Sequence, residues 1–158
     1  MKKNNTIFGN KKHLLILSNQ TLKVFNRHVQ ANGHNESGGI LLGSIYEDCV
    51  EILDAKTPNQ YDTAGPMFFI RSRIGAQPKV NVAWKKSKGT LIYLGEWHTH
   101  SEVNPVPSKA DKEMIKKAFI QTSMEIQFLF LIIVGQKQTF WVGRQDKHGL
   151  NELRPIFI

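Results

Sequence analysis

Apolar and polar residues alternate along the chain in patterns that predict strands and helices in turn. Short apolar or alternating runs bounded by turn residues indicate strands, and apolar residues on one helical face indicate helices. We expect strands at residues 14–17, 38–45, 49–56, 67–71, 90–97, 125–135, 138–144 and 153–158. We expect helices from Ser18 to about Gln30, from Pro78 to about Gly89 and from Ser108 to about Gln121. Helices between strands, with hairpins among them, favour an α/β fold in which helices flank a mixed β-sheet.

One predicted strand is rich in glycine. Residues 38–45 read Gly-Gly-Ile-Leu-Leu-Gly-Ser-Ile. Glycine inside a strand often marks a place where a ligand or another backbone segment approaches closely. We therefore expect a buried strand with a tightly packed neighbour. Residues 57–66 and 101–107 are expected to be loops.

Length and composition are those of one folded domain. The chain has 158 residues, of which 41% are hydrophobic and 22% charged. We assign residues 1–10 to a flexible N-terminal tail and residues 11–158 to a single domain. The longest apolar run, residues 128–134, is too short to cross a bilayer, and residues 1–10 lack the apolar core of a secretory signal. Cys49 is the only cysteine, which excludes an internal disulfide and fits a cytoplasmic location.

Basic residues outnumber acidic ones and give a formal net charge of +8. Such a balance favours acidic partners, so nucleic acid has to be considered. The lysines and arginines are spread along the chain, however, and no recognised nucleic-acid-binding motif accompanies them. We therefore interpret them as solvated surface rather than a nucleic-acid site. The same holds for Arg71 and Arg73, although those two side chains can also meet acidic groups on a partner.

Two histidines and an aspartate form the pattern most indicative of chemistry. His98 and His100 lie two residues apart at the end of a predicted strand, which places both imidazoles on one face. Asp111 follows in the first turn of a predicted helix, where an ionised carboxylate is favoured. Pro105 and Pro107 stiffen the connection. Two His and one Asp can bind zinc and leave its fourth position open to water, as in catalytic zinc sites.

Ser108 and Asp111 also fit a capping box, Ser-x-x-Asp before an apolar run. The two interpretations are compatible, because Asp111 can bind metal while Ser108 caps the helix or points its hydroxyl into the site. Zinc-dependent hydrolysis also needs a general base near the attacking water. Glu96 shares the strand face of the histidines, and Glu36 begins the glycine-rich segment. Spacing alone does not choose between them, since Glu96 can serve as an orienting partner and Glu36 as a surface or capping residue.

The combined motifs resemble those of a known family. They are Glu36-Ser37-Gly38-Gly39-Ile40-Leu41-Leu42-Gly43, Gly95-Glu96-Trp97-His98-Thr99-His100 and Pro107-Ser108-Lys109-Ala110-Asp111. This set is similar to the JAMM motif of the JAB/MPN metalloproteases, and the similarity extends over about residues 14–143. The resemblance implies a cytidine-deaminase-like fold and an isopeptidase with one Zn²⁺ per chain. It also implies that His98, His100 and Asp111 bind the zinc, that Glu36 is the acid/base and that Ser108 steadies the oxyanion.

A narrower resemblance is to the stand-alone bacterial JAB proteins of anti-phage CBASS operons. These also have a Gly-Glu/Asp-Trp-His-Thr-His run after a Gly-Thr-x-x-Tyr-Leu strand, as at residues 89–100. It implies a protease that releases a cyclic-nucleotide synthase (CD-NTase) or a ubiquitin-like modifier from its target. The substrate would be a protein with an extended C-terminal tail, and a ubiquitin-like activating or conjugating enzyme would be encoded nearby. One difference is Ser101, which stands where a proline often follows the second histidine.

Two other functions stay open on the sequence. RadC-type JAB proteins, which are associated with DNA, share the His-x-His and Ser-x-x-Asp spacing, although the Glu-x-Gly-Gly-x-Leu-Leu-Gly segment favours a peptidase. Many MPN domains are metal-free scaffolds without catalytic activity. The complete set of ligand residues in this chain argues against that alternative.

Overall fold

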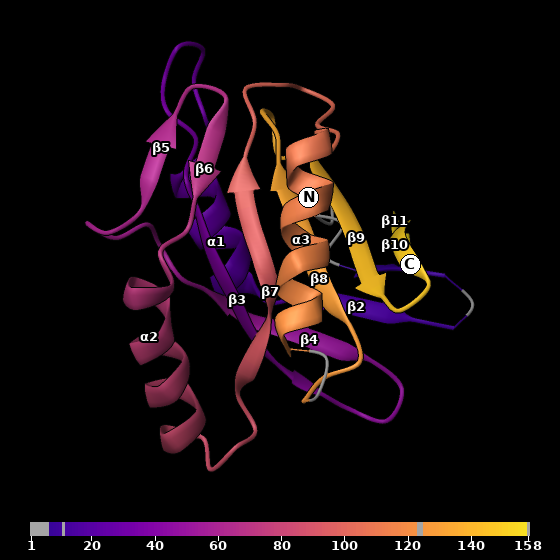
Figure 1. The fold of residues 1–158 in the computed structure, drawn as a ribbon. Coiled ribbons are helices and arrows are strands. Elements are labelled where there is room, and N and C mark those ends of the chain that lie inside the picture. Colours follow the sequence, from indigo (N-terminus) through magenta and orange to yellow (C-terminus); the bar gives the residue numbers. More distant parts are fainter. Residues whose placement is uncertain (1–6, 11, 123–124, 158) are drawn as a thin grey trace.

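The computed structural model describes residues 7–10, 12–122 and 125–157. Within them one large sheet, a separate hairpin and three helices form (Figure 1). The sheet consists of β1 (Ile7–Gly9), β2 (Leu14–Leu17), β3 (Gly38–Ile45), β4 (Val50–Ala55), β7 (Ile92–Thr99), β8 (Leu129–Val134), β9 (Phe140–Asp146), β10 (Gly149–Glu152) and β11 (Arg154–Pro155). The hairpin is β5 (Thr63–Gly65) with β6 (Phe68–Ile70), and the helices are α1 (Asn19–Arg27), α2 (Arg73–Lys86) and α3 (Lys109–Thr122).

The sheet is mixed, as the sequence predicts. Its strand order is β10-β9-β8-β7-β3-β4-β2-β1-β11. Strands β7 and β8 run parallel, as do β2 and β4, and the other neighbours are antiparallel. The apolar run of β8 is buried along its whole length, because helices and neighbouring strands cover it on both faces.

Strand β7 separates two chemical environments, because successive side chains of a strand point to opposite faces of the sheet. Trp97 faces α1, where its ring lies 5.2 Å from that of Phe25. Glu96 and His98 face the other side, and His98 contacts Asp111 on α3. Helix α1 therefore covers one face of the sheet, while α2 and α3 cover the other (Figure 1). The predicted pair of imidazoles on one face follows from this alternation.

The C-terminal segment brings the two edges of the sheet together. Strand β10 pairs with β9 at one edge, and β11 pairs with β1 at the other. Only Leu153 separates these two strands. It is buried, and its N–H donates to the Val142 carbonyl oxygen at 2.8 Å. The rings of Phe8 on β1 and Phe140 on β9 are 6.3 Å apart, so the sheet is strongly curled. Of the predicted strand at residues 153–158, the described part forms only β11 at residues 154–155, and β10 before it was not predicted.

The assignment of residues 1–10 to a flexible tail is wrong for residues 7–9. These form β1, which pairs with both β2 and β11, and Phe8 is buried in the core. The tail assignment for residues 1–6 lies outside the described residues. A strand of three residues is too short to show an alternation of apolar and polar positions. It forms because it pairs with β2 and with β11, and β11 lies at the other end of the chain.

Helix α2 begins earlier than predicted, and Pro78 lies inside it. The Ser72 side chain accepts a hydrogen bond from the Gly75 N–H at 3.4 Å and so caps the helix start. In the first turn of α2, Ile74 is exposed and Ala76 is buried. This turn therefore lacks the run of apolar positions that would predict a helix start before Pro78. A second correction concerns residues 57–66, expected to be loop, which include β5 of the hairpin.

The glycines of β3 are explained by backbone packing, as predicted. A Cβ on Gly39 would lie 2.1 Å from the carbonyl oxygen of Lys56, and one on Gly43 would lie 2.0 Å from that of Glu51. Both distances are far inside van der Waals contact. Only glycine lets β3 approach its neighbour β4 this closely.

None of the helices in the described part of the chain is both long and apolar enough to span a membrane.

We predict that Gly43→Ala lowers the free energy of unfolding by about 2 kcal/mol or more, because the added methyl group meets a backbone carbonyl that cannot rotate away. Urea denaturation followed by circular dichroism measures the change. Glu47→Ala, in the exposed turn after β3, is the control and should stay within about 0.5 kcal/mol of the wild type. Equal stability of the two variants would contradict the close contact.

Candidate active site

The candidate site lies where β7 ends and β3 begins. These two strands are antiparallel, with Gly38 opposite His98. Beyond the strand end, the His100 N–H donates to the carbonyl oxygen of Val134 on β8 at 2.9 Å. Both histidines are therefore fixed at the backbone by neighbouring strands. Glu36, just before β3, is brought to the same end of the sheet by the antiparallel pairing.

His98, His100 and Asp111 converge through one carboxylate. The Nε2 atom of His98 is 3.0 Å from Asp111 Oδ1, and the Nε2 atom of His100 is 3.2 Å from Asp111 Oδ2. Each carboxylate oxygen thus faces one imidazole, and the ring centroids are 5.2 Å apart. The structure places together the three residues that the sequence predicts as ligands.

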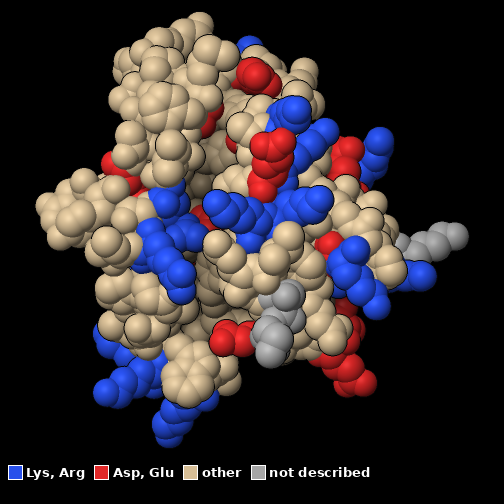
Figure 2. All heavy atoms as spheres, in the orientation of Figure 1, with Lys and Arg blue, Asp and Glu red and all other residues tan. Residues whose placement is uncertain are grey.

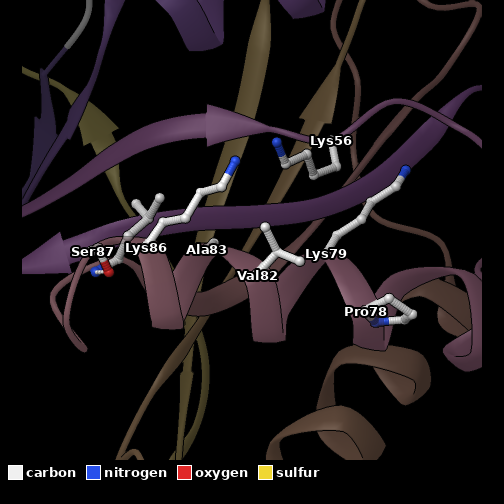
Figure 3. Close-up of a pocket in the computed structure, with 8 residues that line it drawn as sticks. Lys56, Pro78, Lys79, Val82, Ala83, Lys86 and Ser87 are labelled. Carbon is white, nitrogen blue, oxygen red and sulfur yellow. Dashed lines mark hydrogen bonds between the residues drawn. The ribbon is translucent and has the colours of Figure 1, made fainter.

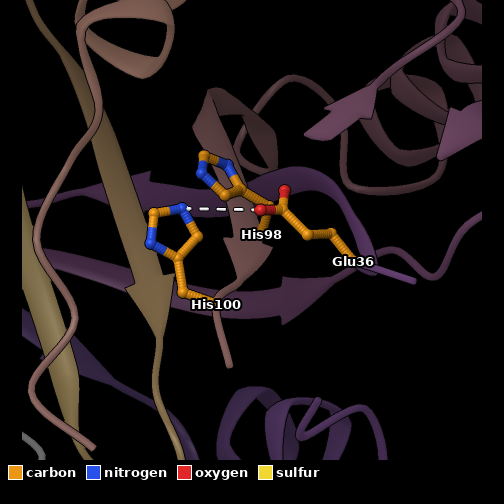
Figure 4. A group of neighbouring side chains, drawn as sticks. All are labelled: Glu36, His98 and His100. Carbon is orange, nitrogen blue, oxygen red and sulfur yellow. Dashed lines mark ion pairs between the residues drawn. The ribbon is translucent and has the colours of Figure 1, made fainter. Parts of the chain in front are cut away.

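Glu36 joins this group from the opposite side. Its Oε1 atom is 3.7 Å from His100 Nε2, the contact drawn as a dashed line in Figure 4. The carboxylate is buried, with 7% of the residue exposed. Its backbone N–H donates to the carbonyl oxygen of Gly65 on β5 at 2.9 Å. The hairpin therefore helps to fix the position of Glu36.

Asp111 and Ser108 form the predicted capping box at the start of α3. The Asp111 N–H donates to Ser108 Oγ at 3.1 Å, and the Ser108 N–H donates to Asp111 Oδ2 at 2.8 Å. This reciprocal pair orients the Asp111 carboxylate while it faces the histidines. Ser108 is exposed and lines the cleft beside the site. Helix capping and a place at the site are compatible in the structure.

Burial and close charges shift the protonation equilibria of these groups in different directions. Burial raises the pKa of Glu36, and the neighbouring His98 and His100 offset this only in part. Burial by itself would raise the pKa of Asp111, but hydrogen bonds from His100 and His98 hold that pKa well below its usual range. The pKa of His100 is lowered by burial and raised by Asp111 and Glu36, with a net rise. Asp111 is therefore ionised, and Glu36 has an increased affinity for a proton.

The arrangement fits a metal ion. Possible ligand atoms of Glu36, His98 and His100 all lie within 4.8 Å of one another. His100 Nδ1 is buried and has no hydrogen-bond partner among the described residues, which is costly for a polar atom unless something else binds it. Imidazole nitrogens with carboxylate oxygens are ligands that suit a divalent transition metal. The site can therefore hold a metal ion.

Glu96 does not belong to this group, although it shares the strand face of the histidines. Its carboxylate accepts hydrogen bonds from Arg71 Nε at 2.7 and 2.8 Å and from the Tyr93 hydroxyl at 2.6 Å. The Arg71 Nη2 atom lies 2.6 Å from the same carboxylate. The interpretation of Arg71 as solvated surface is therefore wrong, because a buried carboxylate on β7 holds it, whereas Arg73 is exposed as expected.

The hydrogen bonds around Thr99, the residue between the two histidines in the sequence, were not predicted. Thr99, fully buried, accepts from the Ser37 N–H at 2.9 Å and contacts the Gln30 side chain at 3.4 Å. Gln30 Nε2 donates to the carbonyl oxygens of His34 at 2.7 Å and Pro66 at 3.0 Å. These bonds join β7, the segment before Glu36 and the hairpin. The predicted helix to about Gln30 ends earlier, at Arg27, and a lone glutamine in the loop after it gives no sequence signal for such a role.

A cleft leads to the site between α3 and the hairpin. Its volume is about 420 Å³, and His98, Ser108 and Asp111 lie along it. In Figure 2 this part of the surface is hollowed, and Lys and Arg side chains gather on both sides of the hollow. His98 and Asp111 are therefore reached from the surface through this cleft.

Comparison with known proteins shows several relatives. Residues 18–144 match the family of prokaryotic homologs of the JAB domain. A Pseudomonas aeruginosa (strain BWHPSA011 / Pa011) protein named CD-NTase/cGAS isopeptidase is 41% identical over 100 residues, 63% of this chain and 63% of that protein. A protein of the same name from Escherichia coli (strain TW11681) is 30% identical over 146 residues, 92% of this chain and 90% of that relative. A third, from Vibrio cholerae serotype O1, is 31% identical over 121 residues, 77% of this chain and 74% of that protein.

Among solved structures, a protein from Desulfitobacterium hafniense matches with a TM-score of 0.65 and 20% identity. The match covers 90% of this chain and 91% of that one. At this identity the likeness concerns the fold alone. The family match, in contrast, covers most of the sequence and includes all of the residues that converge at the site. The chain therefore belongs to the prokaryotic homologs of the JAB domain.

Proposed function

We propose that this protein is a zinc-dependent isopeptidase that detaches a CD-NTase or a ubiquitin-like modifier from its target in the cytoplasm during anti-phage CBASS defence. One observation carries the proposal, the convergence of Glu36, His98, His100 and Asp111 at the end of an open cleft. The names of the relatives, CD-NTase/cGAS isopeptidase, support the same substrate class.

His98, His100 and Asp111 would hold one Zn²⁺ per chain. Two imidazoles and a carboxylate are a typical ligand set for catalytic zinc. When bound, zinc acts as a Lewis acid that acidifies water and polarises a carbonyl group. The capping box orients Asp111, since the backbone N–H of Ser108 donates to its carboxylate, while the hydrogen bonds from His100 and His98 keep the pKa of Asp111 low and the group ionised.

Glu36 is the proposed general base. Its burial raises the pKa of the carboxyl group toward the range in which a group can both take and return a proton near neutral pH. In the proposed reaction, Glu36 accepts the proton of the attacking water and then delivers it to the departing amine. If that amine is a lysine side chain, the reaction is deconjugation. The bond from Glu36 N–H to Gly65 keeps the carboxylate next to His100.

Ser108 is the proposed oxyanion partner. Its oxygen accepts from the Asp111 N–H, which leaves the hydroxyl proton free to point toward the cleft. A hydroxyl in this position can donate to the negative oxygen that develops on the scissile carbonyl.

The cleft suits an extended C-terminal tail. A tail in β conformation can lie beside the hairpin, whose strand β6 pairs with β5 on one side only in the described residues. A ubiquitin-like activating or conjugating enzyme would create the bond that this protein cleaves. No observation on the described residues favours the DNA-associated alternative or a metal-free scaffold.

We predict that Glu36→Gln lowers kcat by about a hundredfold or more while zinc stays bound, because the amide cannot accept the proton of water. The assay is cleavage of a fusion that joins the tail of the modifier or CD-NTase to a reporter protein. Glu96→Gln is the matched control, and we expect it to keep most of the activity, since Glu96 contacts Arg71 and Tyr93 rather than the histidines. Normal cleavage by Glu36→Gln together with an inactive Glu96→Gln would reassign the base.

We also predict that His100→Ala and Asp111→Asn each remove a metal ligand and reduce zinc content from about one ion per chain to near zero after dialysis. Elemental analysis measures the content. His34→Ala, which changes an exposed histidine in the loop before Glu36, should retain the full amount. Chelation should inactivate the wild type, and added zinc should restore turnover. A wild type that binds no stoichiometric metal even after reconstitution would overturn the proposal.

A further inference from the structure

The cleft at the site continues as a longer groove along α3. A second cavity, of about 390 Å³, adjoins the first. Arg71, Lys117, Ala118 and Gln121 line both. The combined groove runs from Asp111 at the start of α3 past Lys117 toward Glu125 beyond its end, with α3 on one side and the β6–α2 segment on the other.

The two ends of this groove differ in chemistry. Near the histidines its walls are mainly apolar, with Phe68 and Ile70 from β6 facing Met114 and Ala118 of α3. Further along, Arg73 lies on the opposite side from Lys117, and both are exposed. Figure 2 shows Lys and Arg side chains on both sides of the hollow.

In the part of the groove away from the histidines, only some of the ionisable side chains contribute to the net charge that a ligand meets. Arg71 is matched by the buried Glu96 carboxylate, so this pair is close to neutral for a ligand in the groove. Arg73 and Lys117 form no ion pair with any described residue. Glu125 is the only other acidic residue that lines this part. Arg73, Lys117 and Glu125 together leave this part of the groove with a net charge of +1, and the two exposed cations face a ligand that passes between α3 and α2.

We propose that this groove selects an extended substrate tail that carries an apolar residue beside the scissile bond and an acidic residue further from it, opposite Arg73 and Lys117. The inference rests on the proposed isopeptidase function and names the class of tail that the enzyme accepts. Apolar walls favour apolar side chains through burial, and two unpaired cations favour a carboxylate through charge complementarity.

The geometry of α3 gives the position of the acidic residue. Lys117 lies about 9 Å along the helix from Asp111, at a rise of about 1.5 Å per residue. An extended chain covers this distance in about three residues, at about 3.3 Å each. The acidic side chain is thus expected about three residues from the scissile bond.

The test compares fusions that differ in a single tail residue. Glu, Gln or Lys is placed in turn at positions two to five from the scissile bond, and kcat/KM is measured for each. We expect the Glu tail to be cleaved faster than the Lys tail, because Arg73 and Lys117 attract a carboxylate and repel an ammonium group. Since solvent screens exposed ion pairs, we expect the difference in kcat/KM to be only about five- to tenfold at low salt. This preference should be strongest about three residues from the bond and should shrink at high salt.

Charge-reversed variants assign the effect to the groove. Lys117→Glu and Arg73→Glu should each remove or invert the ratio of Glu-tail cleavage to Lys-tail cleavage. Lys86→Glu is the control with the same change of charge. Lys86 lines a different cavity of about 520 Å³, next to Lys56 and Lys79 on another side of α2 (Figure 3). This variant should keep the wild-type preference.

Binding of the same tails as labelled peptides to the Glu36→Gln variant separates this inference from the proposed reaction. Cleavage at equal rates for Glu and Lys tails at every position, with equal binding, would overturn the groove selectivity and leave the reaction intact. Preferential binding of Glu peptides without cleavage of any fusion by the wild type would support the selectivity and contradict the reaction. Equal loss of the preference in Lys86→Glu would also overturn the assignment to the groove.

Discussion

The antiparallel register between β3 and β7 is the constraint on which the candidate site depends. With Gly38 opposite His98, the residues just before β3 are carried to the end of β7, where the two imidazoles lie. A shift by one residue would turn the histidines to the other face of the sheet. The register is fixed by close backbone packing, since a Cβ on Gly38 would lie 2.5 Å from the Trp97 carbonyl oxygen. The glycines thus contribute to the site without touching it.

The burial of ionisable side chains at the site lowers the stability of the fold. Glu36, His98 and His100 are all buried at the end of the sheet, where an ionised group loses most of its hydration. The close contacts of Asp111 with both imidazoles offset part of this cost, and a bound cation would offset more. A buried polar atom without a hydrogen-bond partner, such as His100 Nδ1, is typical of a functional site rather than of a stabilising one.

The hairpin of β5 and β6 connects the wall of the cleft to the candidate base. Residues of β6 form one wall of the cleft, while the Gly65 carbonyl of β5 binds the N–H of Glu36. Gln30 adds a second connection, since it bonds to Pro66 in the hairpin and contacts Thr99 between the histidines. The wall of the cleft and the segment that positions Glu36 are therefore connected through the hairpin. Arg71, at the end of β6, fastens this wall to β7 through Glu96.

The sequence by itself determined the features that arise from short-range geometry. The alternation of a strand places His98 and His100 on one face, and the Ser108–Asp111 capping box follows from helix-end hydrogen bonding. Only the tertiary structure decided the rest. It placed Glu36 beside His100, bound Glu96 to Arg71 and paired β1 with the C-terminal strand. These contacts join segments far apart in the chain, and their formation depends on strand order and register, which no local pattern encodes.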